Sequence, residues 1–334
     1  MKHLTILVPD DQASFNTFAC IVGACDIFKR ANSFRKENGK EHLFKVELAG
    51  TSENAAIDDG LLTIRPEVNI SAIRKTHLII IPAISHDFEK LEKGNILIAD
   101  WIREQYGGGA EVASMCSGAM ILASTGLLDG KNCSIHWNVA GKLKKLFPEV
   151  IVKADKLITD EHGIYTNGGG YSFLNLILYL IEKYYDRETA IYCSKIYQIE
   201  IDRTMQSGFT IFTGQKSHDD EAVKQAQSYL EYHYQERISV EDLSQKFAIG
   251  RRNFDRRFIK ATGNTPIEYL QRVKIESAKK TLETTRKTIS QVMYEVGYSD
   301  VKAFREVFRK ITGMSPIEYK NKYNKEIFLS ESSR

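Results

Sequence analysis

The sequence predicts two domains: an α/β domain built on a doubly wound parallel sheet, followed by an all-α domain with two helix-turn-helix units. Apolar runs of strand length alternate with helical patterns over roughly the first 200 residues, as in parallel sheets covered by helices. Two segments near the carboxyl terminus, fifty positions apart, are nearly identical and indicate a duplicated helical unit. A chain of 334 residues is long enough for two separate cores.

The elements of the first domain are read from apolar periodicity and turn residues. Strands are expected at 4–8, 44–49, 77–82 and 111–115, with a hairpin of 157–159 and 163–166 around the turn at 160–162. Helices are expected at 19–32, 95–105, 118–124, 171–184 and 187–200. The regular spacing of strands by helices predicts that helices cover both faces of the sheet.

A strand that runs into Cys116 is the sharpest feature of this domain. The small residues Ser117, Gly118 and Ala119 follow, so a tight turn can lead directly into a helix. We therefore expect the thiol on a strained elbow at the edge where open α/β sheets bind ligands. The amino end of the next helix would lower the pKa of this thiol. A buried, inert cysteine is the alternative.

The duplicated segments read FDRRFIKATGNTPIEYL at 254–270 and FREVFRKITGMSPIEYK at 304–320. Each begins in the second helix of a pair, predicted at 251–261 and 301–311, and continues past its end. A short capped helix and a turn that contains glycine precede each second helix. Phenylalanines at i and i+4 in each second helix face inward. A helix, a short turn and a second helix make a helix-turn-helix unit, and two copies are too few for a solenoid.

The outward faces of the two second helices are basic. Arginine and asparagine can pair with guanine and adenine edges in the major groove, and further arginine and lysine suit phosphates. A solvated helix face is the alternative, and duplication of the unit favours DNA. These outward residues are Arg251, Arg252, Asn253, Asp255, Arg256 and Lys260 in the first helix, and Lys302, Arg305, Glu306, Arg309 and Lys310 in the second.

Charge and cysteine content restrict the classes of protein to which this chain can belong. Residues 221–334 hold 22 Lys and Arg against 15 Asp and Glu, a surplus of +7, while the rest of the chain holds 24 against 28, a balance of −4. The five cysteines follow no ligand spacing, which argues against a metal site or a disulfide framework. The sequence shows neither a signal peptide nor a membrane span, so we expect a cytoplasmic protein.

Residues 221–323 resemble the double helix-turn-helix domain of the AraC/XylS family of transcription regulators. Gly297-Tyr298-Ser299, Phe304 and Phe308, and Thr312-Gly313 with Pro316 and Tyr319 carry this resemblance. In that family both second helices enter adjacent major-groove segments on one face of the duplex, about 34 Å apart. The resemblance implies base-facing positions at Arg252, Asp255 and Arg256, and at Lys302, Ala303, Arg305 and Glu306. Many members have arginine where Glu306 stands, so the second helix is expected to read a cytosine edge or to contribute little.

Residues 3–200 resemble the DJ-1/PfpI superfamily, which shares the flavodoxin-like fold of class I glutamine amidotransferases. The elbow at Cys116, the segment 126–130, His136-Trp137 and the segment 163–169 carry the resemblance. This domain followed by an AraC-type domain is the order found in the GlxA family of regulators. The resemblance implies a small-molecule effector, a homodimer and double-stranded DNA as a partner, with RNA polymerase left open as a further partner.

The resemblance also predicts that the first domain is not an enzyme. Catalytic PfpI-type members have histidine directly after the elbow cysteine, where this chain has Ser117. They also have a carboxylate from the first helix, and Cys20 aligns with that position. Nucleophilic catalysis needs such an activating partner, so we expect no catalytic residue and no cofactor or metal. A cysteine-dependent hydrolase or amidotransferase-like enzyme with an accessory helical domain is the alternative, and a helical protein-interaction module is a third.

What remains is a predicted effector pocket at the sheet edge. The family suggests a nitrogenous metabolite such as an amino acid or a quaternary amine, for which Trp137 and Tyr171 would offer cation–π faces. Ordinary aromatic packing is the alternative for both, and a redox pair of Cys20 and Cys116 is a further hypothesis. The predicted pocket residues are Cys116, Ser117, His136, Trp137, Gly169, Gly170, Tyr171 and Cys20. The predicted division is a sensing domain at 1–201, a linker at 202–220, a DNA-binding domain at 221–323 and a tail at 324–334.

Overall fold

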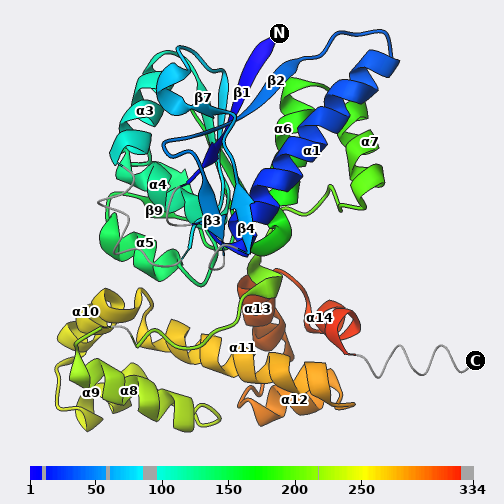
Figure 1. Ribbon diagram of the computed structural model, residues 1–334. Coiled ribbons are helices and arrows are strands. Elements are labelled where there is room, and N and C mark those ends of the chain that lie inside the picture. The colour runs from blue at the N-terminus through cyan, green and yellow to red at the C-terminus, as the bar shows by residue number, and fades with distance from the viewer. Residues whose placement is uncertain (10–12, 58–60, 86–95, 217, 325–334) are drawn as a thin grey trace, which may run out of the picture. The chain divides into compact units, whose positions relative to one another are not determined.

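The computed structural model describes residues 1–9, 13–57, 61–85, 96–216 and 218–324 (Figure 1). The chain forms two compact units, Met1–Gln206 and Ser207–Arg334. The first unit is an α/β domain and the second is all-helical, as the sequence predicts. Beyond Asn324, the predicted carboxyl-terminal tail lies outside the described residues.

A seven-stranded sheet forms the centre of the first unit, in the order β10-β11-β7-β6-β1-β2-β5. All neighbouring strands in it are parallel except the pair of β10 and β11, the hairpin predicted from the sequence. A central strand of a parallel sheet is buried on both faces, and all four residues of β6 are buried accordingly. The strands are β1 (Lys2–Val8), β2 (Phe44–Gly50), β5 (Val68–Asn69), β6 (Leu78–Ile81), β7 (Glu111–Ser114), β10 (Ile158–Glu161) and β11 (Ile164–Asn167).

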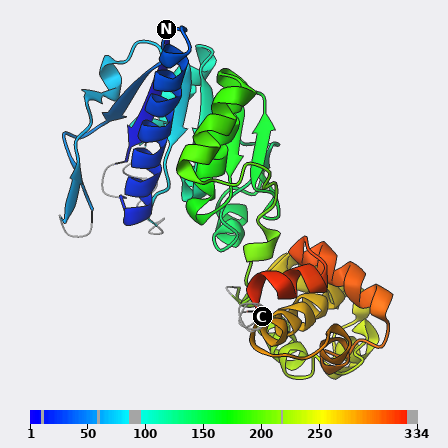
Figure 2. The same cartoon turned by 90° about the vertical axis from the view of Figure 1, so that its right-hand side faces the viewer.

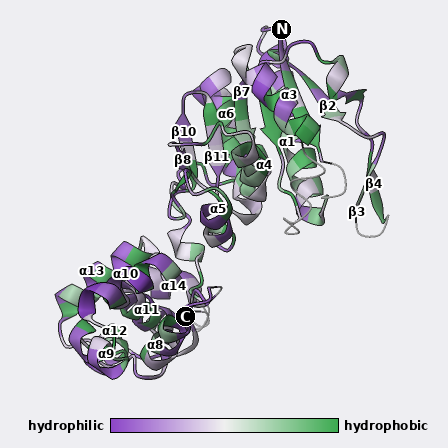
Figure 3. Ribbon diagram, turned by 90° about the vertical axis from the view of Figure 1, so that its left-hand side faces the viewer, coloured by the Kyte–Doolittle hydropathy of each residue, from purple (hydrophilic) through white to green (hydrophobic). Residues whose placement is uncertain are grey.

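Helices cover both faces of this sheet (Figures 1 and 2). One face carries α1 (Phe15–Glu37), α6 (Phe173–Tyr184) and α7 (Arg187–Tyr197), and Figure 2 shows α1 and α6 side by side. The other carries α3 (Ile96–Gly107) and α4 (Ala119–Ser124). Each face has its own apolar core, and hydrophobic residues gather along the strands in Figure 3. The predicted doubly wound architecture is therefore confirmed.

Several small elements cannot be predicted from the sequence because they are too short for a periodic pattern. They are the hairpin of β3 (Ala55–Ile57) and β4 (Leu62–Ile64), the short helices η1 (Ile70–Ala72) and α5 (Ala140–Leu146), and the pair of β8 (Asn132–Cys133) and β9 (Ile151–Val152). Strands of two or three residues show no alternation of apolar and polar side chains that could be recognised.

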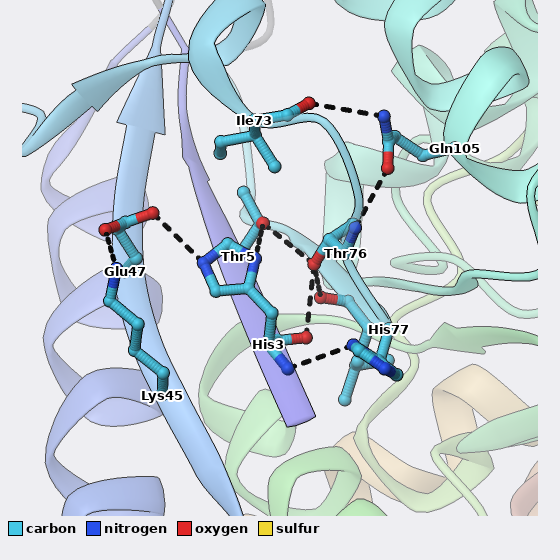
Figure 4. A network of polar contacts seen from close by, with 9 residues as sticks. His3, Thr5, Lys45, Glu47, Ile73, Thr76, His77 and Gln105 are labelled. Carbon is cyan, nitrogen blue, oxygen red and sulfur yellow. Dashed lines mark hydrogen bonds and ion pairs between the residues drawn. The ribbon is translucent and has the colours of Figure 1, made fainter. Parts of the chain in front are cut away.

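A polar network ties the strands together near the amino ends of β1 and β6 (Figure 4). The backbone N–H of His3 donates to His77 Nδ1 at 3.0 Å, and His3 Nε2 lies 3.0 Å from Glu47 Oε2. The backbone N–H of Thr76 donates to Gln105 Oε1 at 2.9 Å, which attaches α3 to the same place. These polar groups satisfy each other's hydrogen bonds within the fold. They lie at the amino ends of the strands, opposite to the carboxyl ends where Cys116 lies.

The second unit consists of two small cores that share one long helix. Phe254 and Phe258 are fully buried in the first core, and Phe304 and Phe308 in the second, as the sequence predicts. Helix α11 contributes Tyr269 and Leu270 to the first core and Ile275, Ala278 and Leu282 to the second. The helices are α8 (Glu221–Tyr232), α9 (Val240–Lys246), α10 (Arg251–Thr262), α11 (Pro266–Thr284), α12 (Ile289–Glu295), α13 (Val301–Thr312) and α14 (Pro316–Tyr323).

The turns of the two repeats use the same backbone but different residues. Ala248 and Gly297 have φ angles of +53° and +74°, and each lies two residues after the end of its short helix. The following residue in each turn, Ile249 or Tyr298, donates its N–H to a helix carbonyl five residues earlier. The left-handed region favours glycine, so the first repeat holds an alanine in a conformation that glycine adopts without strain.

The segment predicted to be a linker, 202–220, is divided between the two units. Its first part packs on the α/β unit, where the Leu157 N–H donates to Thr204 O and the Gln206 N–H to Asp155 O. Its second part packs on the helical unit: Lys279 Nζ donates to Thr210 O at 2.6 Å, and the Phe212 N–H donates to a Glu276 carboxylate at 3.1 Å. Composition alone predicts an irregular connection. In the structure, backbone groups of this segment form hydrogen bonds with the first unit at 204–206 and with the second unit at 210–212.

Candidate functional site

The elbow at Cys116 has the geometry that the sequence predicts. Strand β7 ends at Ser114, and Cys116 begins the short helix η3 (Cys116–Gly118) with a φ of +53°, which is unusual for a residue other than glycine. A Cβ on Gly118 would lie 2.4 Å from Pro82 O, so only glycine fits there. The run of small residues after Cys116 therefore allows the helix to start directly against the end of β6.

Ser117 is held by the backbone of Ile84 beside this elbow. Its buried hydroxyl donates to Ile84 O at 2.7 Å and accepts the Ile84 N–H at 3.0 Å. Both bonds hold the segment after β6 against η3. The Ser117 hydroxyl also lies within hydrogen-bond reach of the Cys116 thiol, and its place in the pocket wall stays a prediction.

Neutral groups surround the thiol of Cys116. The backbone N–H groups of Gly170 and Ser117 point at it, and Asn16 Nδ2 lies 3.9 Å from Sγ. Cys20, also predicted here, is fully buried on the same helix as Asn16 and close enough to interact with Cys116. The sequence reading missed Asn16 because it started α1 at residue 19, about one helical turn after its actual start at Phe15.

Burial controls the acidity of these thiols. It raises the pKa of the Cys116 thiol, although hydrogen bonds from Gly170, Ser117 and Asn16 oppose the rise. Burial also raises the pKa of Cys20, to about 12. The expectation that the helix end would lower the pKa of Cys116 is therefore wrong: the side chain is only 2% exposed, and desolvation outweighs the backbone amides.

The raised pKa of the Cys116 thiol predicts that this cysteine is alkylated slowly at neutral pH. A free cysteine has a pKa of about 8.5, so a raised pKa leaves less thiolate at neutral pH and moves reactivity to higher pH. We expect iodoacetamide to alkylate Cys116 more slowly than the half-buried Cys25 at neutral pH, with the rate at Cys116 rising as pH increases. Peptide mass spectrometry, with Cys116→Ser to assign the signal, measures both rates. Faster labelling of Cys116 than of Cys25 at neutral pH would reveal an activated nucleophile and favour the enzyme alternative.

The second wall of the predicted pocket is a run of glycines under His136. A Cβ on Gly169 would lie 1.7 Å from the ring of His136, so the imidazole lies directly on this glycine. The ring of His136 also lies 5.2 Å from that of Trp137, and its Nδ1 accepts the Asn138 N–H at 3.1 Å. The sequence places these two segments far apart, and the fold brings them together at the carboxyl end of β11.

Tyr171 lies at the outer end of the same glycine run. It is 72% exposed, and its ring lies 5.9 Å from that of Phe173. The aromatic neighbour of Trp137, by contrast, is His136. A cation–π site formed by Trp137 and Tyr171 therefore stays a prediction.

A separate cavity lies at the antiparallel edge of the sheet. It has a volume of about 270 Å³ and lies between β10, α6 and the segment that precedes Gln206. In its wall, Asp160 accepts hydrogen bonds from Tyr179 and Lys183 at 2.6 and 2.7 Å. Its lining residues are Leu157, Ile158, Asp160, Asn175, Leu178, Tyr179, Glu182, Ile201, Arg203 and Thr204, none of which was predicted as a pocket residue.

In the helical unit, α10 presents the predicted polar residues on its outer face. Arg251 forms an ion pair with Glu241, and Arg256 Nη2 donates to Asn253 Oδ1 at 3.0 Å. Asp255 is half-buried. The exposed members of the predicted set on this helix are Arg251, Arg252, Asn253, Arg256 and Lys260.

Helix α13 presents a similar face. Asp300 caps the helix by accepting the Ala303 N–H at 2.6 Å, and the two buried phenylalanines face the opposite side. In Figure 3, α10 is coloured mainly as hydrophilic, whereas α13 alternates hydrophilic and hydrophobic residues. All predicted positions on α13 are exposed, namely Lys302, Ala303, Arg305, Glu306, Arg309 and Lys310.

Metal sites and membrane-spanning helices are two further possibilities for the described part of the chain. There, no group of three or more His, Cys, Asp or Glu side chains is placed to hold a metal ion. Among the helices described, none is both long and apolar enough to cross a membrane.

Each of the two units contains a segment that matches a known protein family. Residues 25–182 match the DJ-1/PfpI family, and residues 243–322 match a family described as a helix-turn-helix domain. A solved structure of a Vibrio parahaemolyticus protein superimposes with a TM-score of 0.52 at 22% identity, covering 58% of this chain and 98% of the other. At that identity the likeness supports the fold alone.

Curated relatives match across both units. The HTH-type transcriptional regulator CdhR of Pseudomonas aeruginosa is 20% identical over 296 residues, which are 88% of this chain and 85% of CdhR. The HTH-type transcriptional regulator GbdR of the same species is 24% identical over 217 residues, 65% of this chain but only 59% of GbdR. GlxA of Rhizobium meliloti, also an HTH-type transcriptional regulator, is 23% identical over 62% of this chain and 64% of its own length.

Proposed function

Because the chain joins a DJ-1/PfpI domain to an AraC-type helix-turn-helix domain, we propose that it is a DNA-binding transcription regulator. The observation that carries this proposal is the pair of matched helices, α10 and α13, each with buried phenylalanines on one side and exposed cationic side chains on the other. Side chains such as Arg252, Arg256 and Arg305 can read base edges, and neighbouring lysines can neutralise phosphates. The matching relatives are named as transcriptional regulators.

The first unit then acts as a sensor rather than as a catalyst. Asn16 and backbone amides surround Cys116, none of which can accept its proton, and Ser117 is engaged with Ile84. The relatives are named as transcriptional regulators and not as enzymes, which agrees with the prediction that the chain is not an enzyme. The effector we propose is a small nitrogenous metabolite, such as an amino acid or a quaternary amine, held near Cys116, His136 and the Gly169–Tyr171 run.

Dimerisation is a further part of the proposal. Helix α1 presents an outer stripe in which Phe15 and Val22, two turns apart, are exposed, with partly buried Phe18, Ala19 and Cys25 between and beside them. An apolar stripe of this kind on a helix is typical of a surface that a partner covers. We call α10 and α13 the recognition helices, and a second copy of the chain would bring a second pair of them to one operator.

The test is direct binding to duplex DNA. Genomic fragments that the full chain retains are sequenced, and the affinity for a selected fragment is compared with that for a scrambled duplex of equal length. We expect a specific affinity at least about a thousandfold above the scrambled duplex, falling steeply as salt rises because counterions leave the phosphates. Equal affinity for both duplexes, or none for either, would refute the proposal and favour the protein-interaction alternative.

A further inference from the structure

Gln206, the last residue of the α/β unit, is buried and fully engaged. Its side chain is 2% exposed, and Nε2 donates to Ile135 O at 2.9 Å and to Lys156 O at 3.1 Å. Its Oε1 accepts the backbone N–H of Gly169 at 3.3 Å. A Cβ on Gly168 would lie 2.8 Å from the Gln206 side chain, so the amide fills the space that glycine leaves. A single glutamine thus bonds three separate segments of the first unit.

Two of these segments form the candidate effector pocket. Ile135 directly precedes His136, whose ring lies on Gly169, and Gly169 directly precedes Gly170, whose N–H points at Cys116. The pocket walls and Gln206 therefore share backbone groups. A ligand that shifts either wall changes the hydrogen bonds available to the Gln206 amide, and unsatisfied buried amides are costly.

The next residue in the chain belongs to the helical unit. Ser207 is buried there and begins the short helix η5 (Ser207–Phe209), which packs on the end of α13. Ser207 Cβ lies 3.8 Å from the position of a Cβ on Gly313, the residue that ends α13, and Tyr323 OH donates to Gly208 O at 3.0 Å. One peptide bond thus links a residue held by the pocket walls to a residue held by the second recognition helix.

We propose that Gln206 is a positioning residue that couples occupancy of the pocket to α13. This inference rests on the proposed function and deepens it, because it names the path by which an effector would act on DNA binding. A shift in the Ile135–His136 or Gly168–Gly170 segment moves the Gln206 side chain, and the covalent bond to Ser207 passes the movement to η5 and the carboxyl end of α13. Coupling of this kind requires two arrangements that both ligands distinguish.

The test compares the full-length wild type with Gln206→Met, which keeps the length of the side chain and removes its hydrogen bonds. Gln198→Met is the matched control, since Gln198 is exposed in the same unit. Amide hydrogen exchange followed by mass spectrometry is expected to rise about tenfold or more in peptides covering 168–171, where the Gly169 N–H loses its acceptor. A rise in peptides covering 207–210 and 309–314, absent in Gln198→Met, is the signature of coupling. A purely structural role would leave these second-unit peptides unchanged, and that result would overturn the proposal.

A second arm uses the wild type, so it does not depend on a variant that folds. Linkage is reciprocal, so binding of a selected genomic duplex should change exchange at 168–171 by about fivefold or more. The same duplex should leave these residues unchanged in Gln206→Met. If no duplex binds, the proposed function fails while the exchange comparison between wild type and variant still stands. Binding that leaves 168–171 unchanged in the wild type would reject the coupling alone.

Discussion

Replacing Gly297 with alanine is expected to destabilise the helical unit by about 2–5 kcal/mol, the largest single effect we foresee. Gly297 has a φ of +74°, a conformation that costs an alanine roughly 1–2 kcal/mol. An added Cβ would lie 2.0 Å from the backbone oxygen of Gln235 and 2.9 Å from Lys274 Nζ. The lysine can move, but the backbone of Gln235 must shift, and overpacking of this kind costs about 1–3 kcal/mol more.

The repeat supplies the matched control for this change. Ala248 occupies the equivalent turn position in the first repeat with a φ of +53°, so Ala248→Gly relieves strain there at the cost of a more flexible unfolded chain. We expect this variant to change stability by less than about 1 kcal/mol. Urea unfolding followed by circular dichroism measures both free energies of unfolding. Equal stability of Gly297→Ala and the wild type would mean that the turn at 297 is not held against Gln235 as described.

Replacing Arg256 with alanine is expected to weaken specific DNA binding by about 1–3 kcal/mol, or roughly 5- to 150-fold, and to relax the sequence preference at one position. Arg256 is exposed on α10, and Asn253 Oδ1, 3.0 Å away, holds its guanidinium at the helix surface. An arginine prearranged in this way can form two hydrogen bonds to a guanine edge. Arg252→Ala is expected to have an effect of the same size.

Arg237 provides the control, because it is exposed in the same unit but outside both recognition helices. Its replacement by alanine removes the same charge, so it should lower affinity only through the general electrostatic contribution. Fluorescence anisotropy with a selected duplex and its single-base variants separates the two effects. If Arg256→Ala loses no more affinity than Arg237→Ala, and its preference at every base is unchanged, the assignment of base contacts on α10 is wrong.

Periodicity located the main elements because their apolar patterns are long. The alternation of strands and helices predicted the parallel sheet, and the paired phenylalanines Phe254 and Phe258 predicted the buried side of α10. The small residues after Cys116 predicted the elbow, since a helix that starts against Pro82 O leaves no room for a larger side chain. These features depend on local sequence, which is why they could be read directly.

The chemistry of the site could not be read in the same way, because it depends on contacts between distant segments. The pKa of Cys116 follows from burial by the whole fold rather than from the adjacent helix end. The role of Asn16 depends on where α1 begins, and helix boundaries are the least certain part of a sequence reading. Gln206 stood in a segment that composition marked as a linker, although its amide is among the most thoroughly bonded polar groups of the first unit.

Helix α11 belongs to both small cores, and this restricts how the spacing between the two recognised DNA segments can change. This helix has 19 residues and is therefore about 28 Å long, slightly less than one turn of duplex DNA. Inserting one residue into α11 would rotate the elements that follow it by about 100°, so that α13 would no longer face the same side of the duplex as α10. Insertions of about seven or eleven residues, close to two or three whole helical turns, restore the phase. Spacing between half-sites can thus change during evolution only in discrete jumps, whereas the bases recognised can change one substitution at a time.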